Sequence, residues 1–124
     1  MKPEIEFTSL IDPTYEPIPG VPGLSQAILA HDPQHDVVTR ILRFEPGTDS
    51  SAMGVQRHEC WEEVFIFEGS FTDLTLGETF TAPCHAVRPP GMPHGPWRSD
   101  TGARMFEVRY YRAEGPVRSE GAGS

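Results

Sequence analysis

The stretch that decides the fold runs from Gln56 to Gly69 and reads QRHECWEEVFIFEG. Residues 63–68 of this stretch are rich in valine, isoleucine and phenylalanine, which is typical of a β-strand. We predict that this strand ends in a tight turn at Gly69. Side chains two positions apart share one side of an extended chain, so Gln56 and His58 face the same way. The turn after His58 then lets Glu62 open the next strand toward the same cavity.

Further short strands are predicted along the rest of the chain. Glycine and proline are frequent, at 12 and 13 of the 124 residues, and no long stretch spaces its apolar residues as a helix does. Apolar and β-branched runs between turns predict strands at residues 24–29, 37–44, 71–76 and 104–111. In the last run a period of two lines one face with apolar and aromatic groups, namely Phe106, Val108 and Tyr110. This pattern favours an all-β sandwich or barrel, and the length fits one domain.

We divide the chain into three segments. Residues 12–23 hold four prolines and two glycines, so they form neither a helix nor a full strand ladder. Residues 1–23 are therefore interpreted as an extended, proline-rich arm over the barrel or over a partner subunit. Residues 24–112 form the barrel, and residues 113–124 are predicted to be a disordered tail with nothing to bury.

Charge and composition limit the partners. The formal charge of −8 argues against nucleic acid and anionic membranes, because such surfaces attract clusters of Lys and Arg. The N-terminus lacks the apolar run of a secretion signal, and no segment approaches the roughly 18 apolar residues of a membrane span. We therefore expect a cytoplasmic protein that acts on a small molecule, with Cys60 and Cys84 as free thiols.

A second cluster, residues 89–94, reads PPGMPH, and its proline-glycine turn is expected to hold the His94 imidazole rigidly. With His58 and Glu62 it makes two histidines and one carboxylate, the set typical of Fe(II) oxygenases that also accepts Mn, Co, Ni or Zn. Gln56 offers a weaker oxygen donor and is interpreted as an optional fourth ligand. The other histidines are interpreted as structural or exposed: His31, His35 and His85.

The two clusters resemble the two sequence motifs of the cupin family. The second histidine, the glutamate and the closing glycine of the first motif correspond to His58, Glu62 and Gly69. The proline, glycine and histidine of the second motif correspond to Pro89, Gly91 and His94. Gln56 stands where the family has its first histidine, and the other departures are Ser50, Pro83 and Arg98. The resemblance spans roughly residues 24–111 and looks most like the branch related to the anti-sigma factor ChrR and to acetylacetone dioxygenase.

The resemblance implies a double-stranded β-helix, which is a jelly-roll barrel. It also implies a divalent metal at His58, Glu62 and His94. Members of that branch include Fe(II) dioxygenases that cleave a carbon–carbon bond next to carbonyl groups, as well as regulatory zinc-binding domains. The expected function is thus a metal-dependent dioxygenase of a small β-dicarbonyl or hydroxy-ketone, with iron as cofactor. The alternatives are a cyclase, lyase or isomerase that works without oxygen, and a sensor that binds without catalysis.

Two further expectations concern surfaces. A dicarbonyl substrate needs a dry, shaped cavity, and its candidate walls are Cys60, Trp61, Met92, Trp97, Phe106 and Tyr110. Phe65 and Phe67 fall on the face opposite to Glu62 and need cover. We therefore expect a homodimer joined through the proline-rich arm and a sheet edge.

Overall fold

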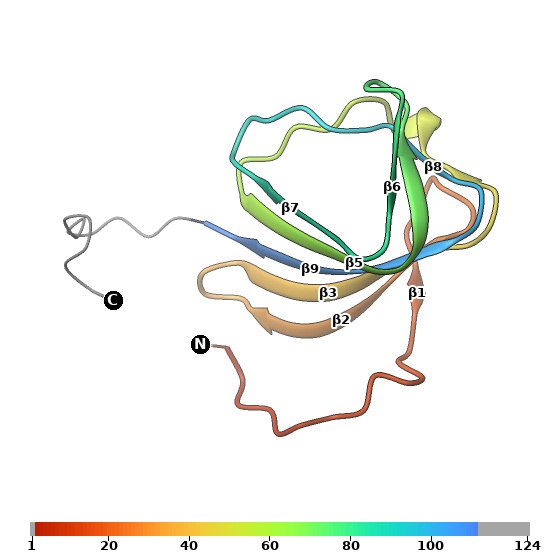
Figure 1. Ribbon diagram of the computed structural model, residues 1–124. Helices are drawn as coiled ribbons and strands as arrows, with labels where there is room; N and C mark the ends of the chain where they lie inside the picture. The colour runs from red at the N-terminus through yellow and green to blue at the C-terminus, as the bar shows by residue number, and fades with distance from the viewer. Residues whose placement is uncertain (1, 112–124) are drawn as a thin grey trace.

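The computed structural model describes residues 2–111, whose strands form two antiparallel β-sheets that curl toward each other (Figure 1). The nine strands are, in chain order, β1 Glu16–Pro17, β2 Leu24–Asp32, β3 Val37–Phe44, β4 Thr48–Asp49, β5 Trp61–Asp73, β6 Glu78–Thr81, β7 Cys84–Arg88, β8 Trp97–Ser99 and β9 Ala103–Tyr110. One short 3-10 helix, Ser51–Met53, is the only helix within this part of the chain. The predicted all-β class is confirmed.

The two sheets share the long strand β5. The larger sheet runs β1-β2-β3-β9-β5-β7, and the smaller one places β6 and β8 beside β5, with β4 beside β8. Sequence neighbours β2 and β3 form an antiparallel hairpin, whereas β3 also pairs with the distant strand β9. Such crossing connections are those of a jelly roll, so the predicted barrel is confirmed.

Strand β5 corrects the prediction of a turn at Gly69. The strand is continuous from Trp61 to Asp73. Its first half pairs with β7 and β9 in the larger sheet, and its second half pairs with β6 and β8 in the smaller one. A shift in register against β9 occurs between Ile66 and Glu68, where the strand bends from one sheet into the other.

Gly69 makes this bend possible. Its φ is +75°, a region that residues with a side chain rarely adopt. A Cβ atom built at Gly69 would also overlap the carbonyl oxygen of Gly102 on the neighbouring chain segment. The glycine therefore closes the barrel corner inside a strand and does not separate two strands.

Alternation along β5 sets the inside and the outside of the barrel. Glu62, Val64 and Ile66 are buried on the inner face, while Phe65 and Phe67 remain 42% and 37% exposed on the outer face. The inner apolar residues form one core between the sheets: Val21, Leu24, Leu42, Phe44, Val64, Ile66, Phe71, Ala103 and Met105. The predicted orientation of Phe65 and Phe67 is confirmed.

The N-terminal segment runs along the outside of the larger sheet (Figure 1). Within it, β1 adds a two-residue edge to β2. The guanidinium of Arg43 lies 5.2 Å from the centre of the Tyr15 ring, and Arg104 donates a hydrogen bond to the Tyr15 hydroxyl at 3.5 Å. The boundary of the arm at residue 23 stays a prediction, and the predicted tail, 113–124, lies outside the described residues.

Two simpler features complete the fold. Cys60 and Cys84 are both free. Within residues 2–111 no helix has the length and hydropathy that a bilayer crossing requires.

We propose that the protein is a homodimer, joined through the N-terminal arm and a sheet edge, in which the outer face around Phe65 is covered. Phe65 lies opposite Phe106 in the sheet, and Val87 on the neighbouring strand is also exposed. Light scattering is expected to give about twice the 13.8 kDa chain mass. Phe65→Glu is expected to shift the mass to the monomer, whereas Leu76→Glu, at an exposed turn away from this face, leaves it unchanged. A monomeric wild-type protein refutes the dimer.

Candidate metal centre

Backbone hydrogen bonds join the two motif clusters. The backbone N–H of Gln56 donates to the carbonyl of His94 at 2.7 Å, and the backbone N–H of His94 donates to the carbonyl of Gln56 at 2.9 Å. The amide of Gly91 donates to the carbonyl of His58 at 2.8 Å. The proline-glycine turn therefore lies directly against the segment that carries His58.

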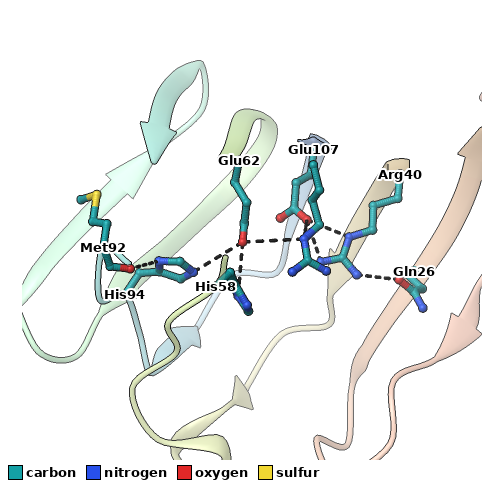
Figure 2. Close-up of polar contacts among 8 residues, drawn as sticks. Gln26, Arg40, His58, Glu62, Met92, His94 and Glu107 are labelled. Atoms are coloured by element: carbon teal, nitrogen blue, oxygen red, sulfur yellow. Dashed lines mark hydrogen bonds and ion pairs between the residues drawn. The ribbon is translucent and has the colours of Figure 1, made fainter. Parts of the chain in front are cut away.

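Three candidate ligands meet inside the barrel, as Figure 2 shows. Oε1 of Glu62 lies 3.2 Å from Nε2 of His58 and 3.6 Å from Nε2 of His94. All three ligand atoms lie within 4.8 Å of one another. Glu62 and His94 are buried, and His58 is partly exposed. The two histidines and the carboxylate that the sequence separates thus form one group that can hold a metal ion.

The hydrogen bonding of His94 indicates what this group is suited to bind. Its Nδ1 lies 3.0 Å from the carbonyl oxygen of Met92, which can only accept, so the proton of a neutral ring sits on Nδ1. Nε2 then presents a lone pair toward Oε1 of Glu62. Among the described residues neither buried atom has a hydrogen-bond partner. Two unpartnered acceptors that face each other favour a cation between them, so these residues fit a divalent metal.

Protonation of the ligands also suits a metal. Burial on its own raises the pKa of Glu62, but the positive charge around it, which includes the permanently charged Arg109, outweighs burial and holds this pKa below its ordinary value. Burial lowers the pKa of His58, despite the opposing charge of Glu62. Near neutral pH the structure therefore presents a carboxylate and a neutral imidazole, the forms that bind metal ions.

Gln56 lies beside this group. Its side-chain nitrogen donates a hydrogen bond to the carbonyl of Met53 at 2.8 Å. This hydrogen bond fixes the orientation of the side-chain amide. Its backbone pairs with that of His94, at the position where the cupin motif has a histidine. A role for the Gln56 oxygen as a fourth ligand stays a prediction.

A cavity of about 310 Å³ opens beside the three ligands. At the far end of β5 its walls are apolar, and the lining residues there include Leu42, Phe44, Ile66, Phe71 and Met105. At the near end its walls are charged: Arg40, Glu62, Arg88, Glu107 and Arg109. A ligand bound here therefore meets charged groups next to the candidate metal site and an apolar wall behind it.

The cavity requires a correction to the predicted walls. Of the six, Trp97 lines the cavity. The side chain of Met92 is 41% exposed, although its carbonyl orients His94. The remaining four lie outside the lining as well: Cys60, Trp61, Phe106 and Tyr110.

The reason for the correction is the orientation of β9. Met105, Glu107 and Arg109 point inward, so Phe106 and Tyr110 point outward. On the outer face the rings of Tyr110 and Trp61 stack with their centres 6.5 Å apart. The Tyr110 hydroxyl donates a hydrogen bond to Glu63 at 2.9 Å.

Sequence reasoning missed the charged residues of the cavity. Arg40, Arg88, Glu107 and Arg109 come from β3, β7 and β9 and face inward next to Glu62. Because charged residues are rarely buried, the face of β9 with Phe106 and Tyr110 is expected to point inward, and the face with Glu107 and Arg109 outward. The recurrence of charge at every second position, Glu107 and Arg109, was the available indication.

Comparisons with known proteins identify the fold. No family model matches the chain, and no curated protein matches it. The structure of acetylacetone dioxygenase from Acinetobacter johnsonii matches with a TM-score of 0.71 and 19% identity, over 87% of this chain and 75% of that chain. The polyketide cyclase RemF from Streptomyces resistomycificus matches with a TM-score of 0.68 and 18% identity, over 88% and 81%. A chain of the complex between Rhodobacter sphaeroides SigE and the anti-sigma ChrR matches with a TM-score of 0.61 and 21% identity, over 81% of this chain and 51% of that chain.

Other matching structures are described as RmlC-like cupins. The chain therefore has the cupin fold, as the two motifs predicted, and its structural neighbours include acetylacetone dioxygenase and the ChrR complex. At these identities the likeness concerns the fold. The chemistry of a protein depends on the residues of its site, which unrelated functions on one fold do not share.

Proposed function

We propose that this protein is a non-haem Fe(II) dioxygenase that cleaves a small β-dicarbonyl or hydroxy-ketone. The observation that carries the proposal is the pair of buried, unpartnered atoms, Nε2 of His94 and Oε1 of Glu62, that face each other beside His58. Two histidines and one carboxylate leave coordination positions open, an arrangement associated with non-haem Fe(II) oxygenases. The fold shared with an acetylacetone dioxygenase supports the substrate class.

The residues of the chain have distinct roles in this proposal. A bound iron supplies the activation of oxygen and the polarisation of the substrate carbonyls. The carbonyl of Met92 keeps the proton of His94 on Nδ1, so that Nε2 stays free for the metal. The apolar wall that contains Phe44, Ile66 and Phe71 packs against the part of the substrate that extends away from the metal ligands, and it excludes water there.

A second candidate, a lyase or cyclase that needs no oxygen, is favoured by one observation. Glu107 lines the same cavity, and burial raises the pKa of its carboxyl, although Arg40 opposes the rise. A carboxyl of raised pKa can hold or return a proton during enolisation of a carbonyl compound. The fold shared with a polyketide cyclase supports this alternative.

The test compares metals. The metal-free protein is loaded with Fe(II) or with Zn under nitrogen, exposed to air with pentane-2,4-dione, and followed for both oxygen uptake and loss of the diketone. The proposal expects equal loss of oxygen and diketone with iron and none with zinc. Diketone loss with zinc and without oxygen uptake would establish the second candidate. If neither metal gives turnover of this or a related dicarbonyl, the proposed reaction is refuted.

A further part of the proposal concerns the class of partner and the compartment. The formal charge of −8 favours a small-molecule partner over nucleic acid or an anionic membrane, and we propose that the protein acts in the cytoplasm.

A further inference from the structure

The residues that line the cavity include more arginines than acidic side chains. Three arginines and two glutamates lie on the inner face of the larger sheet: Arg40, Arg88, Arg109, Glu62 and Glu107. Glu62 on β5 has Arg88 opposite it on β7 and Arg109 opposite it on β9. One carboxylate therefore stands between two guanidinium groups in a single row across the sheet.

The other glutamate, Glu107, already forms an ion pair with Arg40. Nε and Nη2 of Arg40 lie 2.8 and 2.6 Å from Oε1 of Glu107, and both side chains are largely buried. Figure 2 shows this pair, which Gln26 extends through a contact with Arg40 of 2.6 Å. Glu107 and Arg40 thus neutralise each other and leave Glu62 as the near carboxylate for Arg88 and Arg109.

Arg109 has only long contacts with these carboxylates. Its Nε lies 3.8 Å from Oε1 of Glu62 and 4.0 Å from Oε1 of Glu107, beyond hydrogen-bond length. That Nε is buried and has no hydrogen-bond partner in the described part of the chain. If Glu62 binds a metal, its charge is directed to the ion, and Arg109 is less well neutralised.

Arg88 is the more exceptional group. It makes no ion pair within 4.0 Å among residues 2–111, and its buried Nε has no hydrogen-bond partner there. Its guanidinium lies 4.7 Å from the centre of the Trp97 ring, and Trp97 is in turn stacked on Phe71 at 4.4 Å. Stacking holds the flat face of a guanidinium and leaves its N–H donors unused. Arg88 is therefore a fixed cation with free donors on the wall of the cavity.

We propose that the cavity binds an organic anion, a small carbonyl compound that carries a carboxylate, and that Arg88 holds this carboxylate with Arg109 beside it. The inference rests on the proposed function for the chelating end of the ligand, and it adds the anionic end. A guanidinium pairs with a carboxylate through two parallel hydrogen bonds, which matches the free donors of Arg88. The volume of about 310 Å³ suits a molecule of that size.

Two ligands that differ only at one end test the proposal. Pentane-2,4-dione and 2,4-dioxopentanoate share the dicarbonyl unit, and the second replaces a methyl group by a carboxylate. Binding of each is measured by titration calorimetry to the zinc-loaded protein, because zinc has no redox chemistry. The wild type is expected to bind the acid at least about tenfold more tightly than the diketone.

Variants assign that preference to Arg88. Arg88→Met is expected to abolish the preference for the acid and to change affinity for the diketone by less than about twofold. Arg98→Met is the control, because Arg98 lies outside the cavity lining and pairs with Asp100 at 2.9 Å. It is expected to keep the preference. A preference that survives in Arg88→Met, or one that the wild type lacks, overturns the proposal.

Zinc uptake, measured separately, distinguishes this failure from failure of the proposed function. If the protein takes up no metal, the proposed function fails, and the acid is titrated into the metal-free protein with tryptophan fluorescence as the readout. Quenching in the wild type that is lost in Arg88→Met supports the anion subsite without any metal. Quenching that is equal in the two proteins, or absent from the wild type, refutes it.

Discussion

Replacing His94 by alanine is expected to abolish stoichiometric metal binding. His94 supplies one of only three ligand atoms in the group, and its ring is held by the Met92 carbonyl at 3.0 Å. Loss of a residue that merely orients a ligand weakens metal binding by about 10- to 100-fold, so loss of the ligand itself is expected to exceed that range. Elemental analysis and competition with a chelating dye measure the loss.

The control for this experiment is a neighbouring histidine. His85 also lines the cavity, but its nearest carboxylate contact is to Glu63 at 3.7 Å, away from the three ligands. His85→Ala is therefore expected to keep the metal. His58→Ala is expected to lose it like His94→Ala. Wild-type metal content in His94→Ala, with circular dichroism showing a folded barrel, contradicts the assignment of the site.

Replacing Arg40 by methionine is expected to cost about 3–5 kcal/mol of unfolding free energy, the usual effect of removing one partner of a buried ion pair. The side chains of Arg40 and Glu107 are 16% and 4% exposed, so the remaining carboxylate loses its partner in a place that water hardly reaches. Urea denaturation at neutral pH measures the change.

Two further variants isolate the pair. Arg98→Met, which removes an exposed pair with Asp100, is expected to stay within about 0.5 kcal/mol of the wild type. The double replacement Arg40→Met with Glu107→Met is expected to recover much of the stability, because two apolar side chains of similar volume leave no buried charge. A double variant as unstable as Arg40→Met would show that packing, and not charge, explains the loss.

The pH dependence of Arg40→Met follows from the same pair. Burial raises the pKa of Glu107 above its ordinary value of 4.5, and Arg40 opposes that rise, so the pKa rises further without Arg40. A carboxyl with a higher pKa in the folded protein binds more protons there than in the unfolded chain, so stability falls as pH rises through this window. The deficit of Arg40→Met is expected to be smaller at about pH 5 than at about pH 8. An equal deficit at both pH values would contradict this account.

Sequence alone determined the class of the fold and the three residues of the candidate metal centre. Short apolar runs between prolines and glycines predicted strands because side-chain alternation and turn residues are local properties. His58 and Glu62 lie four positions apart beside a strand, and His94 ends a rigid turn, so spacing alone related them to the cupin motifs. The structure brings their ligand atoms within 4.8 Å of one another.

Only the tertiary structure decided which faces look inward and where the charges meet. The sequence predicted a turn at Gly69. In the structure Gly69 packs closely against Gly102, and β5 continues through it from one sheet into the other. In β9 a period of two defines two faces without saying which is buried. The inner face is the charged one, because Glu107 meets Arg40, 67 positions earlier in the chain, and so is not left unpaired. Such a pairing depends on strands that are distant in sequence, and local patterns do not contain it.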